Sequence, residues 1–525
     1  MAIFCDFLPI MLRHSSNFVV LKVKNLHFRF DYYKIGIAMK RITTLLLAVA
    51  AVSMTSFAGG LLHNTNQHIA FMRMMARGAS HEIDGVYTNP AGLAFMDHDG
   101  WTLSLNIQSA TQTRDALTTF ALFPEADHTR LYKGKASAPV IPSLYGAYKR
   151  DRWTFSGFFG FTGGGGKCSF DSGLPVFDAS IMAGIYAQTA GLKKTLADNP
   201  ATAPIMADPR IASLLPLTAD MYDINSSMKG RQYIYGLQLG ATYKPLDWLS
   251  VYAGGRMNYF DGNYTGFVKV LPKPELASAV QQIAIAYPAL APTLNTLVNQ
   301  NGEMANIDLN CSQTGWGITP IIGVDLVWKG FTLAAKYEFK TNLSIENDTK
   351  TAIAEPAAFE AALADYKHGV NTPNDLPAVL YTALGYEFIP NKLRATVEYH
   401  YYDDKHAEMA HDKQKHLTHG THEVLAGVEW DINKMFTVSG GFQNTDYGLS
   451  DDYQTHTSFS CDSYSIGFGG AVNVTEKIKV NLGYFWTTYK DYDRREENYF
   501  NTTLPGKDTY SRTNKVFGAG IDFKF

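Results

Sequence analysis

Two groups of residues in this sequence have types and spacings that could perform chemistry. Four consecutive glycines at 163–166 are followed by Lys167 and Cys168, and a glycine-rich run ending in Gly-Lys can cradle phosphate groups. That loop also needs an earlier glycine and a hydroxyl directly after the lysine. Phe161 and Cys168 occupy those two positions. We therefore predict no phosphate site here.

Histidines form the second group. Six of the 15 histidines fall between His400 and His422, and His416, His419 and His422 are three residues apart. A metal site needs side chains that converge on one point, whereas this run is polar and lysine-rich and indicates a solvated loop. Combinations of Ser, His and Asp occur without a recognisable catalytic setting. We predict no catalytic residue, no metal site and no cofactor.

The composition excludes two further classes of protein. With 31 Phe, 30 Tyr and 7 Trp among 525 residues, the chain has too many aromatic side chains for a disordered protein. The formal net charge of −3 argues against a nucleic-acid partner, because nucleic-acid binders usually carry a basic excess.

An export signal begins at Met39. Lys40 and Arg41 precede an apolar run at 42–52, and the segment ends with the small residues Ser56 and Ala58, three positions and one position before the expected cleavage. This order is typical of a secretory signal peptide, and the apolar run is too short for a membrane anchor. We predict a misassigned start at 1–38, a signal peptide at 39–58 and a mature chain that begins at Gly59.

Cysteine usage after this processing is sparse. Cys168, Cys311 and Cys461 remain, and three cysteines in a long chain do not make a disulfide framework. We predict three free thiols, with one pair in exposed loops as the alternative.

Apolar and polar residues alternate along many segments, for example at 235–243, 393–401 and 479–487. Successive side chains of a strand point to opposite faces, so each such strand has one face in an apolar phase. A soluble β-sandwich would give the same alternation. The lengths of the connections between strands distinguish a soluble β-sandwich from a sheet whose apolar face meets lipid.

Short and long connections alternate along the chain. Tight turns are expected at 149–152, 245–247, 329–330, 390–391, 431–433 and 475–476, and long polar loops at 111–139, 163–229, 271–313, 347–374, 409–419, 448–460 and 492–510. Short turns at one end and long loops at the other are typical of outer-membrane barrels. The last residues, 517–525, alternate up to Phe525. We predict an all-β, 14-stranded antiparallel transmembrane β-barrel, closed because an open sheet edge in lipid leaves backbone groups unsatisfied.

Residues 59–100 do not alternate and contain a short motif, Asn89-Pro90-Ala91, preceded by Arg77-Gly78-Ala79. Gly315-Trp316-Gly317, Tyr337 and Leu376-Pro377 follow later in the same order as in a known family. In these residues the chain resembles the FadL/TodX family of outer-membrane channels for long-chain fatty acids and other hydrophobic compounds. The resemblance spans nearly all of 59–525.

The resemblance implies a monomer in the outer membrane of a Gram-negative cell, with an N-terminal plug (hatch) at 59–100 inside a barrel at 101–525. It also implies capture of ligand among the long loops, binding deeper inside and lateral release at a kink in the third strand. Gly163 and Gly164 are the candidates for that kink, because glycine marks bends in strands. The start of a flexible loop is the alternative reading.

Three further expectations concern the ligand. The stretch 276–298 is too apolar for a solvated loop and predicts short amphipathic helices. A carboxylate head would need a buried cation, and Arg256 and Lys336 lie on strands that flank the loop 271–313. Ordinary lumen or surface charge is the alternative for both. Asn89, Pro90, Ala91, Arg256, Lys336, Gly163 and Gly164 form the predicted set for ligand binding and gating.

The predicted function is uptake of hydrophobic compounds by a protein that is not an enzyme. Its expected partners are a hydrophobic small molecule, outer-membrane lipid and the barrel-assembly machinery. A general porin and an outer-membrane hydrolase are the alternatives. Deletion of residues 59–96 would leave the conductance of a porin unchanged, whereas a plugged channel would become leaky.

The signal peptide gives the first testable prediction. N-terminal sequencing of protein purified from outer membranes should begin at or within a few residues of Gly59. Material that retained residues 1–38 would contradict both the signal peptide and the predicted start.

Overall fold

The computed structural model describes residues 19–23, 26–30, 60–197, 208–214, 221–288, 290–295, 297–298, 305–355 and 357–525. The predicted signal peptide and the predicted start at Gly59 lie outside the described residues. Of the segment 1–38, the structure describes a two-stranded sheet of β1 (Val19–Val23) and β2 (Leu26–Phe30).

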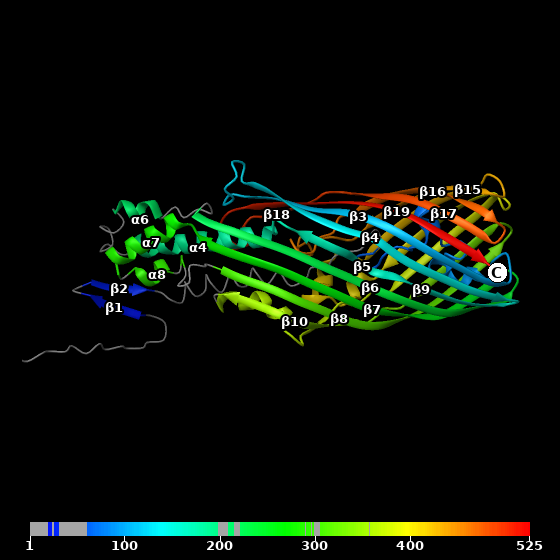
Figure 1. Cartoon of the computed structure of the whole chain (residues 1–525), viewed down its shortest axis with the longest axis horizontal. Coiled ribbons are helices and arrows are strands. Elements are labelled where there is room, and N and C mark those ends of the chain that lie inside the picture. Colours follow the sequence, from blue (N-terminus) through cyan, green and yellow to red (C-terminus); the bar gives the residue numbers. More distant parts are fainter. Residues whose placement is uncertain are drawn as a thin grey trace, which may run out of the picture.

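Within the described residues, fourteen strands close into an antiparallel barrel, drawn lengthwise in Figure 1. They are β3 (Gly100–Phe120), β4 (Thr129–Arg150), β5 (Trp153–Phe170), β6 (Tyr222–Leu246), β7 (Leu249–Pro272), β8 (Ala305–Trp328), β9 (Phe331–Glu338), β12 (Val379–Ile389), β13 (Leu393–Tyr402), β14 (Thr421–Asp431), β15 (Phe436–Asp446), β16 (Ser463–Thr475), β17 (Ile478–Tyr489) and β19 (Gly506–Lys524). Pairing of β19 with β3 joins the last strand to the first. The predicted fold class is confirmed.

The alternation of the sequence separates the two faces of this wall. On β3, Trp101, Leu103, Leu105 and Ile107 point outward and are exposed, whereas the residues between them are buried in the lumen. Corresponding apolar positions on the other strands complete an outer belt. A closed wall with an apolar outside and a polar inside is the arrangement that can cross a bilayer, because the ladder satisfies the backbone.

The six predicted turns all occur at one end of the barrel, which we call the turn end. The opposite end, which carries the long connections, is the loop end. The predicted loop at 111–139 is wrong, because β3 continues to Phe120 and β4 begins at Thr129. Outward positions such as Thr111 and Thr113 become polar there, so the wall continues into water and loses the hydrophobic alternation that marked the strand.

Three short strands extend the wall at the loop end: β10 (Ser344–Glu355), β11 (Asn371–Pro373) and β18 (Tyr492–Glu496). β10 continues the direction of β9 along β8, and β18 pairs with β19. The predicted loops 163–229 and 271–313 are shorter than expected for the same reason, since the flanking strands run on to Phe170 and back to Ala305.

Helices gather at the loop end, at the left of Figure 1. They are α4 (Pro175–Ala197), α6 (Pro209–Leu214), α7 (Pro274–Ala286) and α8 (Ala291–Asn295), with the 3-10 turns η5 (Ala357–Tyr366), η6 (Asp404–His406), η7 (Ala410–His416) and η8 (Tyr499–Asn501). The amphipathic helices predicted in 276–298 are confirmed at α7, because Leu276, Val280 and Ile283 are buried whereas Gln281 and Gln282 are exposed. Among the described residues, no helix is both long and apolar enough to cross a membrane.

These helices and the adjacent strand ends share one large group of buried apolar side chains, the outer apolar cluster. It includes Phe120, Val176, Ile185, Val280, Leu294, Phe459, Tyr489 and Tyr510. Cys168, Cys311 and Cys461 belong to it and are free thiols.

The N-terminal segment 60–96 lies inside the barrel and contains α2 (Ile69–Arg73), α3 (Gly85–Thr88) and η2 (Pro90–Phe95). Every residue from 60 to 96 is buried or half-buried. α2 contacts β15, β16, β17 and β19, while η2 contacts β4 to β9. A glycine on the inner wall permits the approach of α2, since a Cβ atom at Gly467 would lie 2.3 Å from the carbonyl oxygen of Met72.

The register of the wall gives the second prediction. Leu482 points outward at the middle of β17 and is 51% exposed. Leu482→Arg should destabilise the barrel by about 2–4 kcal/mol, because the charge would lie in hydrocarbon. Thr488→Arg is the matched control. Its side chain is on the same face of β17 but lies closer to the loop end than Trp486, the last aromatic residue on that face. Urea unfolding in lipid vesicles should find a cost of about 1 kcal/mol or less for that control; equal costs at both positions would contradict the register.

Candidate functional site

The barrel wall has a gap between β4 and β5. These strands pair on both sides of it, with Ser137 opposite Lys167 and Leu144 opposite Phe159, but residues 138–143 and 160–166 do not pair with one another. The pairing of β5 with β6 is also irregular in this region, with shifts after Phe161 and after Gly163. The third strand is therefore kinked where the sequence predicted a bend.

Two prolines on β4 explain the position of the gap. Pro139 and Pro142 lie in the unpaired stretch, and proline has no N–H to give to a ladder. Proline within a sheet is confined to edges and bulges, and here β4 is locally an edge. The sequence carries a signal for the gap that was missed above: Pro139 and Pro142 precede the glycine run of the next strand.

The glycines of β5 permit the kink, and they lie within the strand, not at the start of a loop. Gly164 has a φ of +88°, a conformation that side chains rarely allow. Gly163 forms an isolated bridge with His63 of the N-terminal segment, and a Cβ atom on Gly163 would lie 2.4 Å from the carbonyl oxygen of Leu62. The kinked strand is thus directed inward against the N-terminal segment.

Hydrogen bonds hold these two segments together. The backbone N–H of Asn64 donates to the carbonyl oxygen of Thr162 over 2.9 Å. The Gln67 side chain bonds both backbone groups of Phe161: Nε2 donates to the carbonyl oxygen (2.6 Å), and Oε1 accepts from the N–H (3.0 Å). The N-terminal segment therefore supplies hydrogen bonds to some of the β5 backbone groups that do not pair with β4.

Apolar side chains border the gap on both sides. On the lumen side, Ala138 and Ile141 of β4 belong to an inner apolar cluster, and Phe161 packs against it. The other members of this cluster are Ile69, Phe71, Met72, Met75, Ala76, Ala110, Leu425, Phe485 and Val516. On the outer side, Val140 is 63% exposed. An apolar surface therefore extends from the lumen to the lipid face.

The Asn89-Pro90-Ala91 motif forms a tight turn near the turn end of the barrel. The Asn89 side chain caps η2 by accepting a hydrogen bond from the N–H of Gly92 (3.2 Å), and its Nδ2 donates to Asp325. The hydroxyls of Thr242 and Ser250 donate to the carbonyl oxygens of Pro90 and Ala91, both over 2.7 Å.

Arg256 and Lys336 both point into the lumen and meet at one carboxylate, Glu338. Arg256 binds both Glu338 oxygens over 2.8 Å, and Lys336 Nζ binds Oε1 over 2.7 Å. Lys336 also donates to the carbonyl oxygen of Tyr87 (2.6 Å). Glu338, which the sequence analysis missed, occupies the place that a ligand carboxylate would take. The role of these two cations in ligand binding stays a prediction.

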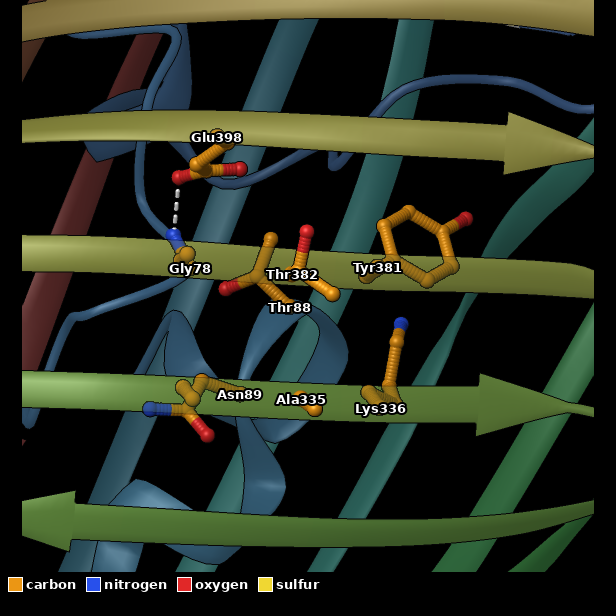
Figure 2. A pocket seen from close by; sticks show the side chains of 10 residues that line it. Gly78, Thr88, Asn89, Ala335, Lys336, Tyr381, Thr382 and Glu398 are labelled. Atoms are coloured by element: carbon orange, nitrogen blue, oxygen red, sulfur yellow. Dashed lines mark hydrogen bonds between the residues drawn. The ribbon is translucent and has the colours of Figure 1, made fainter.

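A small cavity between the N-terminal segment and the wall brings two predicted residues together (Figure 2). Asn89 and Lys336 both line it, and the Lys336 ammonium lies 3.9 Å from the centre of the Tyr381 ring. The other lining residues are Gly78, Thr88, Ala334, Ala335, Thr382, Ala383 and Glu398. Figure 2 shows Glu398 accepting a hydrogen bond from the N–H of Gly78, which ties the segment to β13.

The assignment of the whole histidine run to a polar loop is wrong at its ends. His400 is on β13 and His422 on β14, where the strands continue in register. His400 is buried between Glu398 (2.9 Å) and Glu423 (3.1 Å), because its position on β13 faces the lumen. In the part of the chain that the structure describes, no group of three or more His, Cys, Asp or Glu side chains could hold a metal ion.

Comparisons with known proteins yield similarity at the level of structure. No family model and no curated protein matches the chain. A FadL homologue from Pseudomonas aeruginosa is 12% identical, with a TM-score of 0.57 over 89% of this chain and 100% of that one. The toluene transporter TodX of Pseudomonas putida is 14% identical (TM-score 0.48; 90% and 100% covered), and the CymD monoaromatic hydrocarbon channel is 12% identical (0.45; 85% and 93%).

The comparison rests on the P. aeruginosa homologue, because the alignment covers its whole length. It agrees with the closed fourteen-stranded wall. At this identity the likeness concerns architecture, and this chain has the fold of the FadL-type outer-membrane channels.

Proposed function

We propose that this protein takes up hydrophobic compounds across the outer membrane as a monomer. Compounds enter at the loop end, reach the lumen beside the N-terminal segment and leave sideways into lipid between β4 and β5. The observation that carries the proposal is the gap in the wall, with apolar side chains on its lumen side and on its lipid side.

The loop end supports the capture step. The apolar helices α4, α7 and α8 contribute to the outer apolar cluster at this end. They lie beyond the part of the wall that has the outer apolar belt. Burial of apolar surface is worth about 25 cal/mol per Å². A lipophile that meets this cluster gains free energy that a water-filled pore would not supply, and the step requires no nucleophile and no metal.

The turn end supports sideways release over passage along the axis. Arg73 and Arg77 of the N-terminal segment form buried ion pairs with Glu429 of β14, and Glu82 pairs with Lys479 of β17 (2.7 Å). A compound moving along the axis would have to break the buried pairs with Glu429, each at a cost of about 3–5 kcal/mol. The route through the gap meets apolar side chains instead.

Uptake measurements test the proposal. Cells that carry the protein should take up a labelled alkane or fatty acid faster than cells without it, and lipophiles should co-purify with the detergent-extracted barrel in native mass spectrometry. Equal uptake with and without the protein would contradict the proposed function. Passage of small hydrophilic solutes at the same rate would favour a general porin.

Gly164 gives the third prediction. Gly164→Val should keep the barrel assembled but strain the kinked conformation of β5. Lipophile uptake should fall about tenfold, the ratio that corresponds to 1.4 kcal/mol of such strain. A Cβ atom at this φ would lie 2.4 Å from the carbonyl oxygen of Gln232. Gly157→Ala is the control on β5. The side chain nearest to its Cβ atom would be the movable end of Leu239, 3.0 Å away. Wild-type uptake by Gly164→Val at matched surface abundance would remove the kink from the mechanism.

Asn89 gives the fourth prediction. Asn89→Ala removes the cap of η2 and the bond to Asp325, which should loosen the turn while leaving the strand ladder intact. We expect normal insertion, retained binding at the outer loops and loss of uptake, measured with the same labelled lipophile. A turn that only fills space is the alternative, and unchanged uptake at equal surface abundance would support it.

A further inference from the structure

Four basic side chains lie on the outside of the wall, on three adjacent strands beside the gap. They are Lys135 on β4, Lys167 on β5, and Lys229 and Arg231 on β6. The residues that alternate with them along these strands, such as Cys168, are buried on the inner side of the wall. The four basic side chains therefore point outward. The three lysines are exposed, and Arg231 is half-buried.

The register of the strands brings these cations together into one group, which we call the basic patch. Lys167 is directly opposite Arg231, and Ser169 is directly opposite both Lys135 and Lys229. Neighbouring strands are about 4.8 Å apart, so all four charges share a small area. Like charges directly opposite one another destabilise a sheet. An anion bound between them would remove this cost.

The protein supplies little negative charge to the basic patch. Arg231 pairs with Asp261 of β7 over 2.9 Å, whereas the three lysines form no ion pair with any described residue. Hydroxyls lie between the cations, since Ser137 is opposite Lys167 and Ser169 lies between the other two lysines. Basic groups together with hydroxyl donors are suited to bind phosphate oxygens.

The basic patch begins where the lipid-facing surface ends. On β6, the outward rings of Tyr235 and Tyr233 are followed toward the loop end by Arg231. The ring of Phe161 on β5 lies 4.9 Å from that of Tyr235 and 5.3 Å from that of Tyr233. Aromatic rings mark the level of the lipid headgroups in membrane barrels, and the long loops are extracellular. The patch therefore lies at the headgroup level of the outer leaflet.

The charge at this level is not distributed evenly around the barrel. On β15, at the other side of the wall, the outward residues beyond Phe442 are Asn444 and Asp446. A ring of charge that only kept the wall in water would have no reason to differ between the two sides. The concentration of basic groups beside the gap favours a specific anionic partner.

We propose that the basic patch binds the phosphate groups of an anionic glycolipid of the outer leaflet, a phosphorylated and acylated sugar of the lipopolysaccharide type. Its acyl chains would extend toward the turn end over Val140, which borders the gap and is 63% exposed. A bound lipid would thus form the membrane surface that the gap faces. The inference goes beyond the proposed uptake and does not depend on it, because it requires only that the loop end lie in the outer leaflet.

Native mass spectrometry of the detergent-purified full chain tests the proposal with two probes. One is lipid A with its phosphate groups, and the other is the same lipid after removal of the phosphates. EDTA is present, so that divalent cations cannot link the lipid to acidic side chains. The phosphorylated probe should bind at least about tenfold more tightly, because each basic residue at a membrane surface attracts an anionic lipid. Salt should weaken this preference by screening exposed charges.

Substitutions locate the binding site. Lys167→Gln should lower the affinity for the phosphorylated probe about fivefold, and the combined change of Lys135, Lys167 and Lys229 to Gln should lower it about a hundredfold. The affinity for the dephosphorylated probe should not change. Lys490→Gln is the matched control, because Lys490 is an exposed lysine beyond Trp486, the last outward ring of β17. This control should bind both probes as wild type does.

The melting temperature without lipid provides an independent readout. The triple variant should melt at the same temperature as wild type or higher, because it relieves repulsion between neighbouring like charges. A lower melting temperature would contradict that repulsion and with it the need for an anion.

The remaining outcomes also overturn the proposal. Equal binding of the two probes, or undiminished binding by the triple variant, would show that the patch does not recognise phosphate. An equal loss in Lys490→Gln would indicate a general effect of charge. Displacement of the lipid by inorganic phosphate at a similar concentration would indicate a site for free anions instead of a glycolipid. Lipophile uptake is measured separately, so none of these results decides the proposed function.

Discussion

The structure depends on one constraint: in the hydrocarbon of a bilayer, each backbone N–H and C=O group must find its partner within the protein. The ladder of the barrel meets this requirement around most of the wall, and its longest unpaired stretch lies between β4 and β5. There, Pro139 and Pro142 reduce the number of donors, and the N-terminal segment supplies bonds to Thr162 and Phe161. The gap and the segment in the lumen are therefore coupled, since the segment supplies some of the hydrogen bonds that β4 does not give to β5.

This dependence explains the distribution of polar contacts in the lumen. The N-terminal segment is held to β6, β7, β8 and β14 by hydroxyls, amides and buried ion pairs at the turn end. Next to the gap it is held by the amide of Gln67 and by the Asn64 backbone. A segment fixed strongly at one end and more weakly at the other can change its contacts with β5 without leaving the barrel.

Local chemistry in the sequence predicted the turns and the in-and-out register, because each depends on neighbouring residues only. The predicted ends of the strands were wrong where the wall leaves the membrane, as at Phe120. There the strands continue to pair after the hydrophobic alternation stops. Glu338 could have been associated with Lys336, two residues earlier on the same face of β9. Its bond to Arg256 depends on the register of β7 and β9 on either side of β8, which no local pattern specifies.

The free energies of the contacts decide between the two exits from the lumen. Breaking a buried ion pair such as Arg77 with Glu429 costs about 3–5 kcal/mol, whereas a neutral hydrogen bond such as those of Gln67 contributes about 0.5–1.5 kcal/mol net. An apolar molecule in the lumen also recovers burial free energy continuously as it passes Ala138, Ile141 and Val140 toward lipid. The axial exit offers no such compensation, because its contacts are charged. Under the proposed function, the side of this barrel is therefore expected to open before its end, because the polar contacts beside the gap are the weaker ones.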